Sequence, residues 1–189
     1  MITLSRSNLA TIEESLDFAR RVGASGLIFE RFVPLGRGRQ MADQVLLPAD
    51  WHGAVCDIAA CAGLQIEPQE TLPFHAYWLH LDGREECLQG AACNLGESMA
   101  LMPDGTVFAC RRLPIPVGNA LAQSMVEIRN RLAGYAPDAL RHRLHGPVCR
   151  NCSVPACAGC RALALAMTGD WLADDPRCVR RLESEGDSA

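Results

Sequence analysis

The chain has 189 residues, 18 basic and 22 acidic side chains, a formal net charge of -4 and 49% hydrophobic residues. This composition predicts a soluble globular protein and excludes a disordered or fibrous one. The acidic balance argues against nucleic acid or an anionic membrane as the main partner, because both require a basic surface. No apolar stretch approaches the length of a membrane span and the N-terminus lacks a signal-peptide pattern, so we expect a cytoplasmic protein.

The first region of the chain, residues 1–72, alternates strand and helix signals. In chain order the pattern predicts a strand, a helix opened by a Thr11–Glu14 capping box, a strand, a second helix and a third strand, at residues 2–4, 11–23, 26–33, 48–63 and 64–66. The predicted fold class is α/β, with consecutive β-α units of the parallel-sheet kind. Three strands and two helices cannot close a barrel, so we expect this region to be a piece of a larger structure.

The second region, residues 73–189, contains short elements between cysteine motifs. Residues 98–110 read as two short strands around a Pro-Asp-Gly turn, which carries Cys110 back beside the segment that holds Cys93. A helix is expected after Asn119, with one apolar face formed by Leu121, Met125, Ile128 and Leu132. A last helix is expected at residues 161–168.

Cysteine is the residue type that points most directly to function. None of the ten cysteines occurs in residues 1–55, two are Cys56 and Cys61, and eight lie between Cys87 and Cys178. Ten thiols are too few for a small disulfide scaffold and too many for chance in a cytosolic protein. Metal binding is therefore the better interpretation.

Four of these cysteines fall within twelve residues, as Cys149, Cys152, Cys157 and Cys160. Two intervening residues within each pair let both thiolates reach one metal centre from a single turn. Zinc sites and iron–sulfur clusters share this spacing, so the pattern by itself leaves both open. Buried reduced thiols are a poor account, because core cysteines seldom gather among Asn, Ser, Pro and Gly.

The order of the motifs resembles the SPASM domain, the auxiliary-cluster module of many radical S-adenosylmethionine (radical SAM) enzymes. Cys93 is followed after eleven residues by Gly105 and after four more by Cys110, which fits the family spacing. The cysteines of the 149–160 cluster are separated by two, four and two residues, where the family pattern has two, five and three. Residues 1–72 look like the last third of a radical SAM partial barrel, which makes 73–189 a small, irregular α+β SPASM-like module.

The resemblance implies two auxiliary [4Fe–4S] clusters. Carried over residue by residue, the first cluster takes Cys87, Cys93, Cys110 and Cys160. The second takes Cys149, Cys152, Cys157 and Cys178. Cys160 lies in the 149–160 group but serves the first cluster, so that cluster joins the 98–110 hairpin to the 149–160 loop. The second cluster joins this loop to the segment that holds Cys178.

The radical SAM motif itself, three cysteines separated by three and then two residues, is absent from this sequence. Cys56 and Cys61 stand four residues apart in a predicted helix without a third partner, and we expect them to be small buried thiols. The chain alone should not cleave S-adenosylmethionine, which would bind only together with the missing front of the barrel. We expect an N-terminally incomplete gene product, or one part of a split enzyme whose partner chain supplies that front.

The sequence thus predicts the cluster-binding portion of a radical SAM/SPASM enzyme, serving electron transfer or substrate binding during modification of a peptide or a cofactor precursor. The implied partners are that substrate, an electron donor and a chain that supplies the rest of the barrel. Two alternatives stay open, a non-enzymatic interaction module that holds two Cys₄ zinc ions and a nonfunctional remnant of a truncated gene. No residue in this stretch identifies the substrate.

Overall fold

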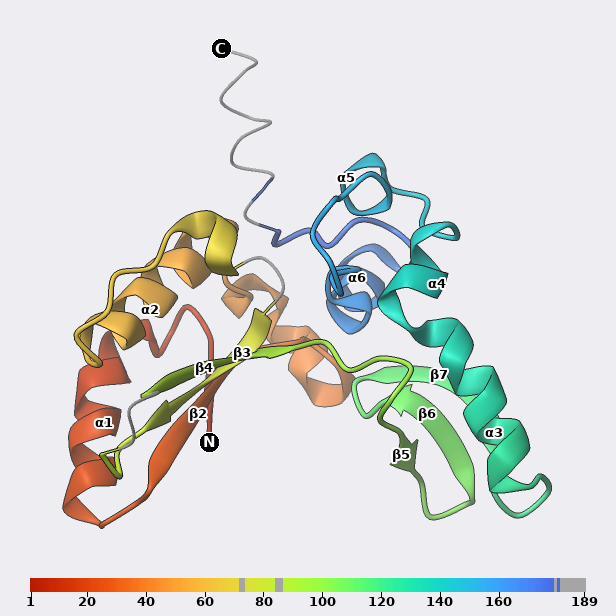
Figure 1. Cartoon of the computed structure of the whole chain (residues 1–189), viewed down its shortest axis with the longest axis horizontal. Helices are drawn as coiled ribbons and strands as arrows, with labels where there is room; N and C mark the ends of the chain where they lie inside the picture. The colour runs from red at the N-terminus through yellow and green to blue at the C-terminus, as the bar shows by residue number, and fades with distance from the viewer. Residues whose placement is uncertain (72–73, 84–86, 179, 181–189) are drawn as a thin grey trace. The chain divides into compact units, whose positions relative to one another are not determined.

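The computed structural model describes residues 1–71, 74–83, 87–178 and 180 (Figure 1). The chain divides into two compact units, one formed by Met1–Ala92 with Arg177–Ala189 and the other by Cys93–Pro176. Both are built from helices and short strands, which confirms a mixed α/β protein. Among the described residues, none of the helices has the length and apolar character needed to cross a bilayer.

A four-stranded mixed sheet forms the centre of the first unit. Its strands lie in the order β1-β2-β3-β4, with bounds Ile2–Leu4, Gly26–Arg31, Phe74–His80 and Leu88–Ala92. The β1–β2 pair is parallel, joined by a helical crossover, whereas β2–β3 and β3–β4 are antiparallel. The predicted β-α unit at the start of the chain is therefore confirmed, and the sheet then continues by hairpin pairing.

The predicted third strand at residues 64–66 is wrong, because these residues form no strand. The strand that pairs with β2 is β3, whose seven residues include Phe74, Tyr77 and Trp78. A long aromatic-rich segment forms a fuller ladder than three residues directly after a helix, which explains the difference. The compact unit extends to Ala92, and the predicted domain boundary at residue 72 stays a prediction. The partial-barrel assignment itself stays a prediction.

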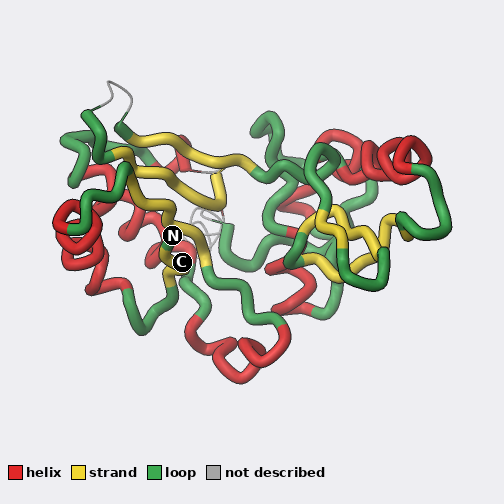
Figure 2. Tube along the Cα trace, turned by 90° about the horizontal axis from the view of Figure 1, so that it is seen from below, coloured by secondary structure: helices red, strands yellow, loops and turns green. Residues whose placement is uncertain are grey.

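Two helices pack on this sheet, α1 at Ile12–Arg21 and α2 at Pro48–Ala60. Figure 2 shows the strands of the first unit lying side by side with helices along them. The core between the layers contains the buried side chains of Leu4, Leu16, Phe29, Trp51, Val55, Ile58, Tyr77 and Leu79. Short 3-10 helices complete the unit at Leu9–Thr11, Gly36–Gln44 and Pro68–Thr71.

The start of α1 differs from the predicted capping box. Thr11 makes no side-chain cap, and its hydroxyl donates instead to the Asn8 carbonyl at 2.8 Å. The periodicity prediction holds over most of the helix, since Ile12, Leu16 and Ala19 are buried. Two acidic residues in the first turn and two arginines in the last suit the helix dipole, which compensates for the missing cap.

The second unit contains a three-stranded antiparallel sheet in the order β5-β6-β7, at Ala100–Leu101, Thr106–Cys110 and Leu113–Asn119. The predicted hairpin at 98–110 is confirmed as β5 and β6. Strand β7 was not predicted, because Pro114 and Pro116 argue against a strand. Both prolines are tolerated since β7 lies at the edge of the sheet, where a missing ladder donor costs little.

Helices follow the sheet in the second unit, with α3 lying beside β7 (Figure 1). They comprise α3 Met125–Leu132, the 3-10 helix Ala133–Tyr135, α4 Pro137–Arg141, α5 Pro147–Arg150 and α6 Arg161–Thr168. Ile128 and Leu132 are buried as predicted, but Leu121 precedes the helix and is exposed. A capping box between Ser124 and Glu127 starts α3 after Leu121. The predicted last helix, 161–168, is confirmed.

Candidate metal centre

The turn between β5 and β6 carries the glycine of the cysteine–glycine–cysteine motif. The Gly105 amide donates to the Met102 carbonyl at 2.9 Å, and Gly105 adopts a φ of 80°. Asp104 accepts from the Thr106 amide at 3.0 Å, and the Asn119 side chain donates to the Asp104 carbonyl at 3.1 Å. The turn is thus held from both β6 and the end of β7, and it directs the chain towards Cys110.

We expect Gly105→Ala to lower the free energy of unfolding by roughly 1–3 kcal/mol, because an L side chain is strained at this φ. An added Cβ would also lie 2.6 Å from Leu121 Cγ and 2.7 Å from Asn119 Oδ1. Urea unfolding of the anaerobic, cluster-loaded protein measures the loss. Gly134→Ala in the same unit is the matched control, since a Cβ there meets nothing within 4 Å. Equal stability of the two variants would contradict the strain argument.

The Cys93 sulfur lies among other thiols of the second unit. Loss of solvation raises the pKa of Cys93 to about 11, while a hydrogen bond from the Leu95 backbone lowers it. Negative charge on Cys160, Cys110 and Cys157 raises it further, in that order of size. The negative charges of Cys110, Cys157 and Cys160 thus reach the Cys93 sulfur, and the grouping of Cys93 with Cys110 and Cys160 in one cluster stays a prediction.

The loop that carries the four cysteines is organised by an arginine. Arg141, from the end of α4, donates to the backbone carbonyls of Cys152, Val154 and Cys157, the latter two at 3.0 and 3.2 Å. A guanidinium satisfies several carbonyls at once because its donors form a rigid planar fork. The loop therefore keeps its shape without regular secondary structure, and the side chains of Cys152 and Cys157 are buried in it.

Cys149 lies in α5, where two aspartates hold its backbone and its sulfur. Asp174 accepts from the amides of Cys149 and Val148 at 2.7 and 3.3 Å. The Asp175 amide donates to the Cys149 sulfur at 3.3 Å, and its carboxylate accepts from the Cys160 amide at 2.9 Å. Segment 174–175 thus ties the turn of Cys149 to the turn of Cys160, so that the two ends of the loop are fixed together.

The hydrogen bonds at the sulfurs fit metal-bound thiolates. Backbone amides donate to Cys149 from Asp175 at 3.3 Å and to Cys110 from Arg112 at 3.4 Å, and a Leu95 backbone bond reaches Cys93. Sulfurs that accept N–H bonds are typical of cluster ligands, whose reduction potential these bonds tune. The donor set therefore suits iron–sulfur chemistry.

Two thiols of the first unit behave differently. Cys56 donates to the Ile66 carbonyl at 3.9 Å and Cys87 donates to the Ala62 carbonyl at 3.6 Å. A sulfur that donates carries a proton, as a neutral thiol does. Cys56 is only partly buried, so the prediction of a buried thiol is not met there, and Cys87, a predicted ligand, would have to exchange its carbonyl contact for a metal.

Among the described residues, no three His, Cys, Asp or Glu side chains are arranged as ligands of a single metal ion. The division of the cysteines into two ligand sets therefore stays a prediction. Of the eight predicted ligands, Cys87 and Cys178 belong to the first unit and the other six to the second.

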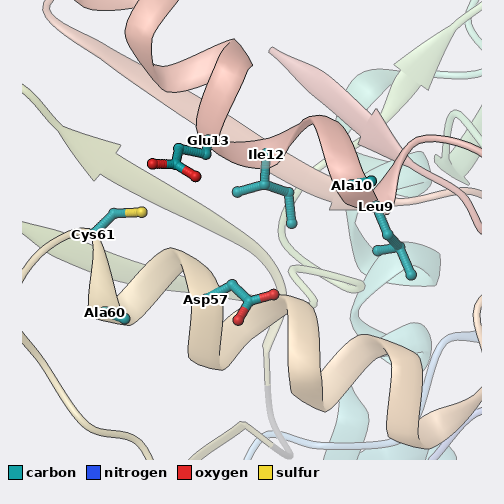
Figure 3. A pocket seen from close by; sticks show the side chains of 7 residues that line it. All are labelled: Leu9, Ala10, Ile12, Glu13, Asp57, Ala60 and Cys61. Carbon is teal, nitrogen blue, oxygen red and sulfur yellow. The ribbon is translucent and has the colours of Figure 1, made fainter.

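Cys61 lines a pocket between the start of α1 and the end of α2 (Figure 3). The pocket has a volume of about 510 Å³, and the carboxylates of Glu13 and Asp57 also line it. Cys61 is exposed, so the expectation that it is a buried thiol is wrong; it follows the last turn of α2 rather than facing the core. Partial burial, the largest cause, raises the pKa of Cys61 above the usual thiol value, partly offset by Arg20.

Comparison with known proteins agrees with the motif assignment. Residues 93–153 match the SPASM family of iron–sulfur cluster-binding domains, a range that includes Cys93, Cys110, Cys149 and Cys152. The AdoMet-dependent heme synthase of Methanosarcina barkeri is 29% identical over 95% of this chain and 55% of its own length. The enzyme of the same name from Nitratidesulfovibrio vulgaris is 23% identical over 93% of this chain and 52% of its own length.

The chain spans about half the length of these two curated relatives. The domain match covers the hairpin of β5 and β6 together with Cys149 and Cys152. The similarity to the relatives extends across both units. From the motif spacing and these matches, residues 93–153 are identified as a SPASM iron–sulfur cluster-binding domain, in a chain that is similar along both units to AdoMet-dependent heme synthases.

Proposed function

We propose that this chain binds two auxiliary [4Fe–4S] clusters. The first is held by Cys87, Cys93, Cys110 and Cys160, and the second by Cys149, Cys152, Cys157 and Cys178. The observation that carries the proposal is the set of N–H groups directed at the sulfurs of Cys93, Cys110 and Cys149. Such bonds stabilise a charged thiolate more than a neutral thiol, whose sulfur is only a weak acceptor.

When bound, such clusters supply one-electron transfer or an attachment point for a substrate. The protein's own contribution is to position the thiolates and to exclude water. Cys149, Cys152 and Cys157 are buried, and Arg141 fixes the backbone that carries the last two. A dry, preformed loop keeps the ligand geometry when charge on the centre changes.

The substrate class that the comparisons favour is a haem precursor rather than a peptide. Both relatives described above are named AdoMet-dependent heme synthase, and they align along more than nine-tenths of this chain. We propose that the complete enzyme contains this chain together with the part of a radical SAM barrel that binds S-adenosylmethionine. That part is supplied by a further segment or by a partner chain, and an electron donor completes the system.

A chimera tests this role. The corresponding part of the Methanosarcina barkeri relative is replaced by this chain, and the anaerobic product is assayed for S-adenosylmethionine cleavage and for haem formation from its immediate precursor. We expect both activities, and we expect the same chimera with Cys149→Ala to lose haem formation. A chimera that retains its clusters and cleaves S-adenosylmethionine but forms no haem would reject the haem-precursor assignment.

A further inference from the structure

Arg161 is a buried cation at the first position of α6. Its side chain is 1% exposed, although arginine is rarely buried so completely. The guanidinium donates to the carbonyls of Gly159 at 3.4 Å and Trp171 at 3.0 Å, and also to that of Ala173. These bonds hold the positive charge at one place between the cysteine loop and the segment that follows α6.

One guanidinium nitrogen faces a predicted cluster ligand. Arg161 Nη2 lies 3.6 Å from Cys149 Sγ, on a sulfur that also accepts the Asp175 amide at 3.3 Å. Gly159 makes room for this contact. A Cβ at residue 159 would lie 2.7 Å from Arg161 Nη2 and 3.0 Å from Cys149 Sγ, so any larger residue would intrude between them.

The charges around Cys149 oppose one another. The Asp175 amide and the Arg161 guanidinium lower the pKa of the Cys149 thiol, whereas the carboxylates of Asp175 and Asp174 raise it. Burial is the largest influence and brings this pKa to about 12. Arg161 is the cation that offsets the two carboxylates at this sulfur.

We propose that Arg161 is a positioning residue that raises the reduction potential of the cluster bound through Cys149, an inference that rests on the proposed function. Reduction adds negative charge to a buried centre, and a fixed cation at a ligand sulfur stabilises the reduced form more than the oxidised form. The guanidinium keeps its charge at every relevant pH, so the effect does not depend on protonation.

The test is a redox titration of the anaerobic protein, followed by electron paramagnetic resonance of the reduced clusters. Arg161→Gln removes the charge and should shift the potential of one cluster to a lower value. Arg161→Lys keeps a charge without the planar fork and should give a smaller shift. Arg129→Gln is the matched control, because Arg129 is an exposed arginine of α3 in the same unit and lies outside the cysteine loop.

Unchanged potentials in an Arg161→Gln protein that retains its iron would overturn the inference, as would an equal shift in Arg129→Gln. Wild-type protein without iron and sulfide would instead overturn the proposed function. If the Arg161 variants do not retain their clusters, wild-type protein labelled with ¹⁵N only in the arginine guanidinium groups replaces them. Pulsed electron paramagnetic resonance of this reduced protein should then detect a ¹⁵N coupling, and its absence would count against the contact.

Discussion

Anaerobically purified protein should be brown and contain about eight iron and eight sulfide per chain, because eight thiolates with SPASM spacing supply ligands for two cubane clusters. Chelation of that iron should unfold the second unit in particular. This unit has short helices and a small sheet. Much of its cysteine loop is held only by hydrogen bonds to a few side chains, such as those of Arg141 and Asp175. Cluster binding therefore contributes to folding free energy, as metals do in other small cysteine-rich modules.

The matched control is a protein with both Cys56→Ala and Cys61→Ala, which should keep its full iron content. Neither thiol is a predicted ligand, and Cys56 already uses its sulfur to contact His52 and the Ile66 carbonyl. A zinc content of about two per chain without sulfide would reject the clusters and support the Cys₄ zinc module.

Paired cysteine substitutions are expected to separate the two ligand sets. If Cys93 and Cys160 belong to one cluster, the double variant Cys93→Ala/Cys160→Ala should lose up to about four iron per chain. The variant Cys93→Ala/Cys157→Ala should lose up to about eight, because it removes a ligand from each cluster. Comparing these two double variants is informative because the negative charges of both Cys160 and Cys157 raise the pKa of Cys93.

The opposite result, with the larger loss in Cys93→Ala/Cys160→Ala, would exchange Cys157 and Cys160 between the clusters. Iron and sulfide analysis, with the spectrum of the remaining cluster, reads the outcome. Cys178→Ala provides an additional test, since it should lower iron by up to about four and leave the hairpin cluster in place. Unchanged iron in that variant would remove Cys178 from the ligands.

Local sequence patterns predicted the elements that local physics controls. The 3.6-residue periodicity identified α1 and α2, and the Pro-Asp-Gly turn identified the hairpin of β5 and β6. Gly105 could be assigned to the turn because only a residue without a Cβ adopts its positive φ easily. The cysteine spacings likewise indicated a metal centre, since a ligand pair on one turn needs a short separation along the chain, and the resemblance of the motif order to the SPASM domain agrees with the family match.

Tertiary structure decided the features that depend on residues far apart. β3 joins β2 rather than starting a new region, because its aromatic residues Phe74 and Tyr77 pack against one another and Tyr77 packs against Trp51 of α2. Whether such a segment extends one sheet or begins another depends on the surface available to it, and periodicity carries no information on that surface.

At the candidate metal centre, the roles of Arg141 and Arg161 could not be predicted from the sequence either. An Arg in a sequence is usually a solvated side chain, and nothing in the residues around Arg141 or Arg161 distinguishes them from the other basic residues. Their role arises because the loops leave backbone carbonyls and a sulfur without regular secondary-structure partners. A buried carbonyl must find a donor, and the folded chain brings these guanidinium groups to it. The sequence alone therefore predicted which cysteines can bind iron, and the tertiary structure decided which charges surround them.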